Sequence, residues 1–184
     1  MSVEGSITKA NYIDYDKALN LGKKLMQDGN DNVFGFYIIV GINVGLRIGD
    51  ILKLKNEDFN FGSVTFREEK TKKSKTVVFN DKIISAYKNL NKRSSEYTFL
   101  SQKGSVFSKQ QINRKIKKYF VAKNKNYSSH SLRKSFGRRV YENNNQSEYA
   151  LMKLSELYNH SSLKITRDYL DITQEELNDI YMSL

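Results

Sequence analysis

The most apolar part of the chain is residues 33–46, where almost every side chain is hydrophobic. A helix needs about 20 apolar residues to cross a bilayer, so this stretch is too short for a membrane span. A helix that is hydrophobic on all sides is normally buried in the core of a protein. We therefore expect residues 33–46 to form a central buried helix on which the other elements pack, and we expect no membrane partner.

The rest of the sequence predicts further helices and one small sheet. Apolar residues at helical spacing indicate helices at about residues 14–27, 48–52, 80–90, 108–120, 129–141, 147–158, 161–170 and 173–181. The expected N-terminal caps are Asp14 or Asp16, Asn80, Ser108, Ser147 and Ser161. Alternating side chains predict strands at residues 63–68, 75–79 and 97–100. The expected fold class is mainly α with a small antiparallel β-sheet (α+β), in a single domain over residues 1–184.

The chain is strongly basic, with 31 Lys and Arg against 20 Asp and Glu and a formal net charge of +11. Residues 103–139 contain twelve basic residues and no acidic one. A basic run of this length favours a polyanionic partner, and nucleic acid is a better candidate than an anionic membrane surface. The contacts expected from this run are Arg114, Lys117, Lys118, Lys134 and Arg138.

Some kinds of chemistry are excluded by residue types that the sequence lacks. Cysteine is absent and there are only two histidines, which excludes disulfides, cysteine nucleophiles and Cys-ligated metals and argues against a His-rich metal site. The sequence also has no Gly-rich phosphate loop and no acidic metal cluster, so we expect neither a metal nor a cofactor. Its first residues lack a signal-peptide pattern, so the expected location is cytoplasmic, in a bacterial, viral or mobile-element setting.

Three short clusters contain residue types suited to phosphoryl transfer. In the first, residues 45–50 read Gly-Leu-Arg-Ile-Gly-Asp. Arg47 follows the most apolar helix, where a guanidinium needs an anionic partner. Asp50 could be that partner in a structural ion pair, or it could orient Arg47 toward a phosphate. The cluster by itself leaves both interpretations open.

The second and third clusters contain the two histidines. Residues 130–133 read His-Ser-Leu-Arg, and the spacing places His130 and Arg133 on one face of a helix. Such a pair can hold a phosphate and move a proton, although an exposed His beside an Arg is also common on surfaces. In the third cluster, His160 precedes Tyr169 on an amphipathic helix. Tyr169 could be half-buried packing, or a nucleophile if its phenol is aimed at phosphorus.

Taken together, the three clusters resemble the catalytic domain of the tyrosine recombinases, the phage integrase family. That family has Gly-Leu-Arg-x-x-Glu/Asp, then His-x-Leu-Arg, then Leu-Gly-His-Ser-Ser with a Tyr nine residues after the His. Residues 45–50, 130–133 and 158–169 fit in that order, within a resemblance that spans about residues 36–169. One departure is Tyr158-Asn159 in place of the common Leu-Gly, which removes no reacting group. The implied fold is that of the catalytic domain of DNA breaking-rejoining enzymes.

The resemblance implies a site-specific DNA recombinase or integrase that acts through a 3′-phosphotyrosine intermediate without metal or ATP. The implied catalytic residues are Arg47, Lys70, His130, Arg133, His160 and Tyr169, with Asp50 in an orienting role. Tyr169 would attack phosphorus, with His130 as its general base and Lys70 as the acid for the leaving 5′-oxygen. The two arginines and His160 would bind the non-bridging oxygens.

The family's hairpin lysine has two candidates in this chain. In the family this lysine lies in a Lys-Thr-Gly-like turn eight residues before a Pro, and Lys70 gives the best match. Val78 stands in place of that Pro, so Lys72 remains an alternative. A simpler interpretation is that Lys72, Lys73 and Lys75 form a basic hairpin that contacts DNA phosphates.

The resemblance also leads to expectations about assembly. Family members usually carry an N-terminal DNA-binding domain, which we expect to be absent here. We expect a monomer in solution and a tetramer on DNA, with residues 171–184 packing either in cis or on a neighbouring protomer. Two other functions stay open, a non-catalytic DNA-binding relative of the same fold and a type IB topoisomerase-like enzyme that relaxes DNA.

Overall fold

The computed structural model describes residues 10–29, 31–67, 74–91 and 94–172 of the chain. The helices in this part are α1 (Tyr15–Gln27), α2 (Asn32–Val44), α3 (Ile48–Ile51), α4 (Asn56–Phe61), α5 (Asp81–Lys88), α6 (Lys109–Tyr119), α7 (Ser129–Asn143), α8 (Glu148–Tyr158) and α9 (Leu163–Tyr169). Strands β1 (Ser63–Arg67) and β2 (Ser74–Val78) pair antiparallel. The predicted α+β class is therefore confirmed. No helix among the described residues is long and apolar enough to cross a membrane.

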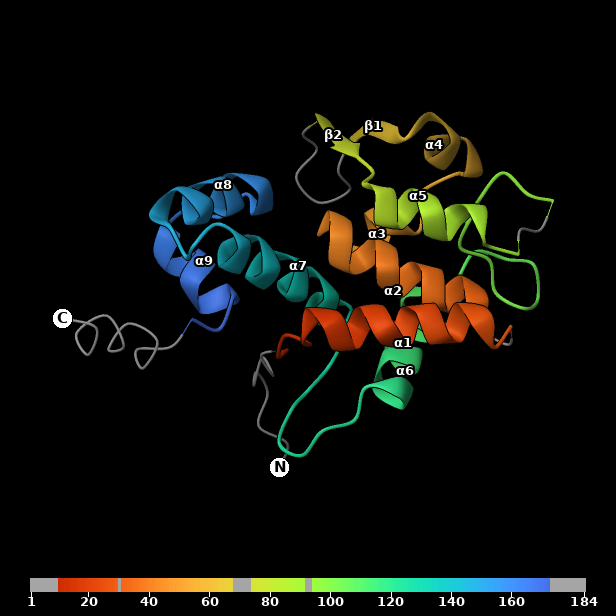
Figure 1. The fold of residues 1–184 in the computed structure, drawn as a ribbon, viewed down its shortest axis with the longest axis horizontal. Helices are drawn as coiled ribbons and strands as arrows, with labels where there is room; N and C mark the ends of the chain where they lie inside the picture. Colours follow the sequence, from red (N-terminus) through yellow and green to blue (C-terminus); the bar gives the residue numbers. More distant parts are fainter. Residues whose placement is uncertain (1–9, 30, 68–73, 92–93, 173–184) are drawn as a thin grey trace, which may run out of the picture.

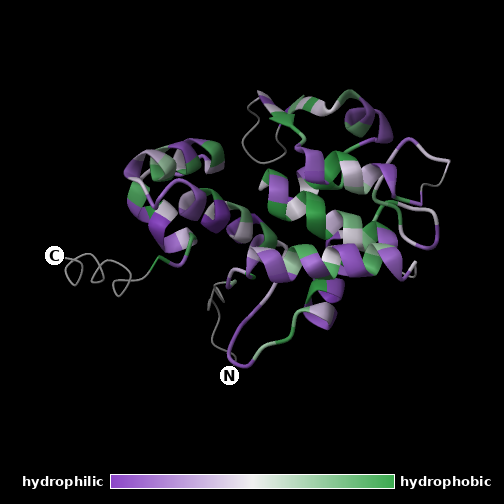
Figure 2. Cartoon of the chain, viewed as in Figure 1, coloured by the Kyte–Doolittle hydropathy of each residue, from purple (hydrophilic) through white to green (hydrophobic). Residues whose placement is uncertain are grey.

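The predicted central helix is confirmed as α2, which is buried along almost its whole length and packs against α1, α5 and α7 (Figure 1). Two glycines let α1 and α2 approach closely, because a Cβ on Gly35 would lie 2.6 Å from the carbonyl oxygen of Gly22. Figure 2 shows mainly green segments on α2 and alternating purple and green segments along α1. This is the pattern expected for a buried helix covered by an amphipathic one.

The two-stranded sheet lies beside α4 and is joined to the core by aromatic side chains. Its register places Ser63 opposite Val78. Phe59 of α4 stacks on Phe79 at 4.7 Å and on Tyr87 at 4.9 Å between ring centroids. The sequence analysis predicts no helix at residues 56–61, because α4 is short and buries little besides Phe59.

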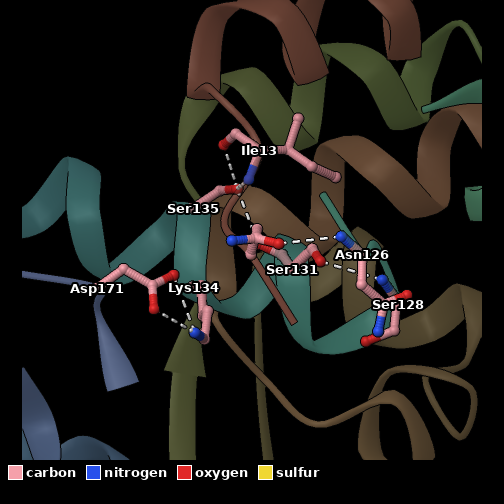
Figure 3. A network of polar contacts seen from close by, with 8 residues as sticks. Ile13, Asn126, Ser128, Ser131, Lys134, Ser135 and Asp171 are labelled. Atoms are coloured by element: carbon pink, nitrogen blue, oxygen red, sulfur yellow. Dashed lines mark hydrogen bonds and ion pairs between the residues drawn. The ribbon is translucent and has the colours of Figure 1, made fainter. Parts of the chain in front are cut away.

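The C-terminal part of the described structure is a smaller group of helices formed by α7, α8 and α9. α7 extends away from α2 and packs against α8, which packs against α9 (Figure 1). These helices share a second apolar cluster of Tyr141, Ala150, Leu151, Leu154, Tyr158 and Leu170. The N-terminal part of α7 is held to the segment before α1, because the Ile13 amide donates to Ser135 Oγ at 3.1 Å (Figure 3).

Two expected elements differ from the structure, and a third cannot be compared with it. Residues 97–100 are not a third strand, because Tyr97 and Leu100 form single bridges to two different segments and no ladder extends. α9 begins one residue later than expected, since the cap is Ser162, whose side chain accepts from the Ile165 amide. The helix expected at residues 173–181 lies outside the described residues.

Candidate active site

A cleft of about 400 Å³ lies where α2 ends and α7 begins. It is lined by residues 46–50 together with Lys109, Ser129, His130 and Arg133. The fold thus brings the first two sequence clusters to one place, although Arg47 and Arg133 lie 86 residues apart in the chain. His160 and Tyr169 are not among the described residues that form its wall.

Gly45 makes the turn that shapes this cleft. It ends α2 with a left-handed φ of 59°, a conformation that side chains with a Cβ rarely adopt. A Cβ at this position would also lie 2.3 Å from the ring of Phe136. The Gly45 carbonyl accepts a hydrogen bond from Arg133 Nη1. One turn therefore ends the central helix and holds one end of a candidate catalytic arginine.

Arg133 is 5% exposed and is held on two sides. Its guanidinium carbon lies 4.3 Å from the centroid of the Tyr158 ring, within cation–π range. The Tyr158 hydroxyl donates to the Arg133 carbonyl at 2.8 Å. The backbone and the side chain of Arg133 are thus both fixed by the last residue of α8.

Arg47, in the turn that follows α2, also contacts Tyr158. Its Nη2 donates to the Tyr158 carbonyl at 3.3 Å. Asp50 lies in the same cleft wall and is 2% exposed, and its amide donates to the Arg47 carbonyl at 3.0 Å. A carboxylate buried so close to Arg47 fits a structural ion pair and equally fits a group that orients Arg47 toward a phosphate. The orienting role of Asp50 therefore remains a prediction.

His160 and Tyr169 are brought together by the turn between α8 and α9. Asn159 ends α8 with a left-handed φ of 56°, which Asn tolerates better than most residues. The rings of His160 and Tyr169 then meet edge to face with centroids 5.2 Å apart. His160 Nδ1 lies 3.0 Å from Thr166 Oγ1, which fixes the orientation of the imidazole.

The electrostatics of this pair follow from burial beside two arginines. Burial lowers the pKa of His160, and the positive charges of Arg133 and Arg47 lower it further. Burial raises the pKa of the Tyr169 phenol, while the charge of Arg133, the close approach of the Arg133 side chain to the phenol oxygen and the charge of Arg47 oppose that rise. The Tyr169 hydroxyl is buried, and no hydrogen bond of acceptable distance and angle reaches it from the described residues. The phenol is therefore held neutral beside two guanidinium groups.

The remaining predicted site residues lie in different settings. His130 is exposed in the cleft at the start of α7. Arg114, Lys117 and Lys118 are exposed on α6, as a DNA-binding surface requires. Lys75 of β2 donates to the Leu157 carbonyl at 3.2 Å, which joins the sheet to the end of α8. The predicted Lys70, Lys72 and Lys73 lie outside the described residues.

Two expected DNA contacts, Lys134 and Arg138, differ from the prediction, because both side chains are turned inward. The side chain of Lys134 is 3% exposed and pairs with Asp171 at 3.0 Å. Arg138 is 9% exposed, pairs with Glu142 at 3.4 Å and lies over the Tyr12 ring. Both cations pair with acidic residues within the chain and therefore lie outside the exposed surface that could contact DNA.

Tyr158 was missed as a site residue by the sequence argument. It is 1% exposed and contacts both arginines, and its ring centroid lies 5.4 Å from His160 and 5.2 Å from Tyr169. The signal available in the sequence was its position two residues before His160, where the resembling family commonly has Leu.

Comparisons with known proteins show which sequences and folds this chain resembles. The family model described as "Phage integrase family" matches residues 23–176. The chain is 29% identical over 154 residues to "Probable integrase/recombinase YoeC" of Bacillus subtilis, covering 79% of this chain and 81% of that protein. It is 26% identical over 150 residues to "Tyrosine recombinase XerA" of Pyrococcus furiosus, covering 77% of this chain and 51% of that protein.

Solved structures show the same fold at lower identity. A crystal structure of XerA recombinase matches with a TM-score of 0.68 at 21% identity, covering 94% of this chain and 64% of that one. The Tn1549 transposon integrase in complex with transposon right end DNA matches with a TM-score of 0.67 at 15% identity, covering 98% of this chain and 68% of that one. A lambda integrase dimer bound to a core site matches with a TM-score of 0.64 at 17% identity, covering 92% of this chain and 50% of that one. The chain therefore spans only part of most of these proteins.

Proposed function

The chain belongs to the phage integrase family, and from this premise we propose that it is a DNA strand transferase that cuts and rejoins specific DNA sites. The Tyr169 oxygen attacks a backbone phosphorus, forming a 3′-phosphotyrosine bond and releasing a 5′-hydroxyl. A 5′-hydroxyl from another strand then attacks the phosphotyrosine, which restores the DNA backbone and the free phenol. The energy of the broken bond is kept in the covalent link, so the cycle needs neither ATP nor a metal.

The observation that supports this most is the convergence of four motif residues on Tyr158. Arg47, Arg133, His160 and Tyr169 come from three distant segments, and each of them contacts this one residue. A chain that kept the fold but not the chemistry would have no need of two guanidinium groups beside a buried neutral phenol. The convergence therefore favours the catalytic function over a non-catalytic DNA-binding relative.

In this proposal the two arginines bind the non-bridging oxygens, where negative charge develops during attack. At about 4 Å and an effective dielectric near 20, each charge pair is worth on the order of 4 kcal/mol before desolvation. Only the part that strengthens in the transition state accelerates the reaction. His160 would donate to one oxygen through Nε2–H, while Nδ1 of the neutral imidazole accepts from the Thr166 hydroxyl.

Proton transfer needs two further groups. We assign His130 as the general base for Tyr169 and Lys70, or alternatively Lys72, as the acid for the leaving oxygen. Because the Tyr169 hydroxyl is buried, attack requires DNA binding to bring it to the phosphorus. Asp50 would keep Arg47 aimed at the phosphate.

The proposed substrate is double-stranded DNA. The net charge of +11 and the exposed Arg114, Lys117 and Lys118 of α6 provide phosphate contacts. By analogy with the family, we propose one catalytic domain that is monomeric in solution, assembles as a tetramer on DNA and acts in the cytoplasm.

Covalent trapping tests the proposal directly. The protein is incubated with nicked duplexes, drawn from DNA flanking its gene and from a pool with randomised arms, and then denatured. Loss of the short nicked fragment prevents religation, so the wild-type protein should accumulate a denaturation-resistant adduct. Tyr169→Phe should bind the same duplexes and form none.

Each other outcome of the trapping experiment has a definite meaning. An adduct with Tyr169→Phe would refute the nucleophile, and no adduct with the wild type would favour the non-catalytic relative. Relaxation of supercoiled plasmid without a preferred site would favour the topoisomerase-like function.

A further inference from the structure

Tyr158 is the last residue of α8 and is almost fully buried, at 1% exposure. It stands where the family pattern commonly has Leu, so the family's shared chemistry does not account for a phenol here. A buried Tyr needs a partner for its hydroxyl, and this one finds it in the candidate active site. Its contacts there indicate a role that Leu could not perform.

The side chain of Tyr158 holds Arg133 at both ends. The guanidinium carbon of Arg133 lies 4.3 Å from the centroid of the Tyr158 ring. The Tyr158 hydroxyl donates a hydrogen bond to the Arg133 carbonyl at 2.8 Å. The guanidinium is held in addition by the Gly45 carbonyl. Leu offers neither a π face nor a donor, so both Tyr158 contacts with Arg133 would be lost with it.

The backbone of Tyr158 holds the second arginine. Its carbonyl accepts from Arg47 Nη2 at 3.3 Å, and the turn at Asn159 directs the chain toward His160. Tyr158 therefore helps to set the positions of both guanidinium groups. A phosphate bound by two arginines needs them at a fixed separation, because fork-shaped hydrogen bonding depends strongly on geometry.

The fold leaves room for this phenol at one position of α7. A Cβ on Gly137 would lie 2.5 Å from the Tyr158 hydroxyl oxygen. Burial also raises the pKa of Tyr158 well above its usual range. A buried, neutral hydroxyl that already donates to a carbonyl is unsuited to serve as a second nucleophile.

We propose that Tyr158 is a positioning residue that holds Arg133 and Arg47 in register for binding the scissile phosphate. This inference rests on the proposed strand-transfer function. It predicts an effect on the rate of cleavage that is separate from DNA affinity and from folding.

The test compares Tyr158→Phe, Tyr158→Leu and Tyr141→Leu with the wild type. Tyr141 belongs to the same apolar cluster and is 7% exposed, so its variant controls for the loss of a buried ring. The probe is the nicked duplex recovered in the wild-type adduct. Three quantities are measured below the melting temperature of each variant: the single-turnover rate of adduct formation at saturating protein, the Kd for the duplex and the folded fraction.

Removal of the hydroxyl in Tyr158→Phe should slow adduct formation about 3- to 10-fold, the effect of one hydrogen bond. Tyr158→Leu also removes the ring and should slow it about 10- to 100-fold. The Kd should stay within about threefold of the wild type in both variants, because phosphate contacts elsewhere carry most of the affinity. Tyr141→Leu should lower the melting temperature and leave the rate unchanged.

Several results would overturn the inference. They are a wild-type rate in Tyr158→Phe, a fall in affinity without a fall in rate, or an equal loss of rate in Tyr141→Leu at equal folded fraction. If Tyr158→Leu does not fold, the Phe variant decides the question by itself. No adduct with the wild-type protein would instead overturn the proposed function, and the inference with it.

Discussion

Lys134, which is buried, and Asp171, which is partly exposed, form an ion pair that ties the end of α9 to α7. The Lys134 ammonium lies 3.0 Å from Asp171 Oδ2 and 3.1 Å from Oδ1 (Figure 3). The same ammonium lies 5.3 Å from the centroid of the Tyr169 ring. Since Asp171 follows Tyr169 by two residues, this pair fixes the segment that carries the candidate nucleophile.

Asp171→Asn should lower the free energy of unfolding by about 3 kcal/mol, because it removes the carboxylate that pairs with the buried Lys134 ammonium. The change is otherwise conservative, since Asp171 has a φ of 55° and Asn also tolerates this region. Urea denaturation followed by circular dichroism measures the effect.

The matched control is Asp168→Asn, one helical turn away on the exposed side of α9. It should change the free energy of unfolding by no more than about 0.5 kcal/mol. Equal effects of the two substitutions would show that the ion pair does not hold α9 in place.

Gly45→Ala should destabilise the protein by more than about 3 kcal/mol, from left-handed strain together with a clash on Phe136. Gly62→Ala separates the two causes, because Gly62 has a φ of 74° but nothing lies within 4 Å of a Cβ placed there. It should lower the free energy of unfolding by only about 1 kcal/mol. Similar urea midpoints for the two variants would mean that Phe136 moves aside without cost.

The sequence predicts the segments of the site well and the directions of its basic side chains poorly. The long apolar stretch and the spacing of the motifs are local patterns, and the structure gathers Arg47, Arg133, His160 and Tyr169 as those patterns imply. Whether a lysine points into solvent depends instead on partners far along the chain. Lys134 finds its partner at Asp171, so no local pattern distinguishes it from an exposed cation.

The role of Tyr158 was hidden for a similar reason. In the sequence it is one departure from a motif, and its meaning depends on contacts with Arg47, which lies 111 residues away. α4 was missed because a helix of six residues has too few turns for a periodic signal. Local spacing predicts which elements form, whereas long-range packing decides what each side chain touches.

Arg133→Ala should slow adduct formation about 100-fold or more while the Kd for DNA changes by no more than about threefold. The reason is that Arg133 is buried in the site and acts on charge that develops during attack. Lys117→Gln is the matched variant, because Lys117 is exposed on α6. It should leave the saturated rate unchanged and reduce the slope of log Kd against log salt by about 0.9. A loss of affinity alone in Arg133→Ala would mean that this arginine only positions the DNA.

The lowered pKa of His160 predicts a loss of stability in mild acid. Burial and the charges of Arg133 and Arg47 keep this imidazole neutral in the folded protein below its ordinary pKa of 6.5. As the pH falls, His160 is protonated in the unfolded chain before it is protonated in the folded protein. The stability that the neutral imidazole contributes is therefore present above about pH 6.5 and is lost as the pH falls toward the lower pKa of the folded state. The free energy of unfolding of the wild type minus that of His160→Gln should therefore decrease below about pH 6.5. Urea titrations between about pH 5 and 8 measure it, and parallel curves for the two proteins would contradict the pKa shift.

Tyr169→Phe should leave the fold as stable as the wild type or stabilise it by up to about 2 kcal/mol. Its hydroxyl is buried, and no hydrogen bond of acceptable geometry reaches it from the described residues, so its removal relieves a desolvation cost. Tyr158→Phe removes a hydroxyl that does donate, to the Arg133 carbonyl at 2.8 Å, and should destabilise the protein by about 1 kcal/mol. Urea denaturation of the two single variants measures the free energy of unfolding and compares the loss of these two hydroxyl groups, which lie on neighbouring rings. A stability loss in Tyr169→Phe as large as that in Tyr158→Phe would show that the Tyr169 hydroxyl is bonded in the resting protein, with the nearby Arg133 side chain as the donor.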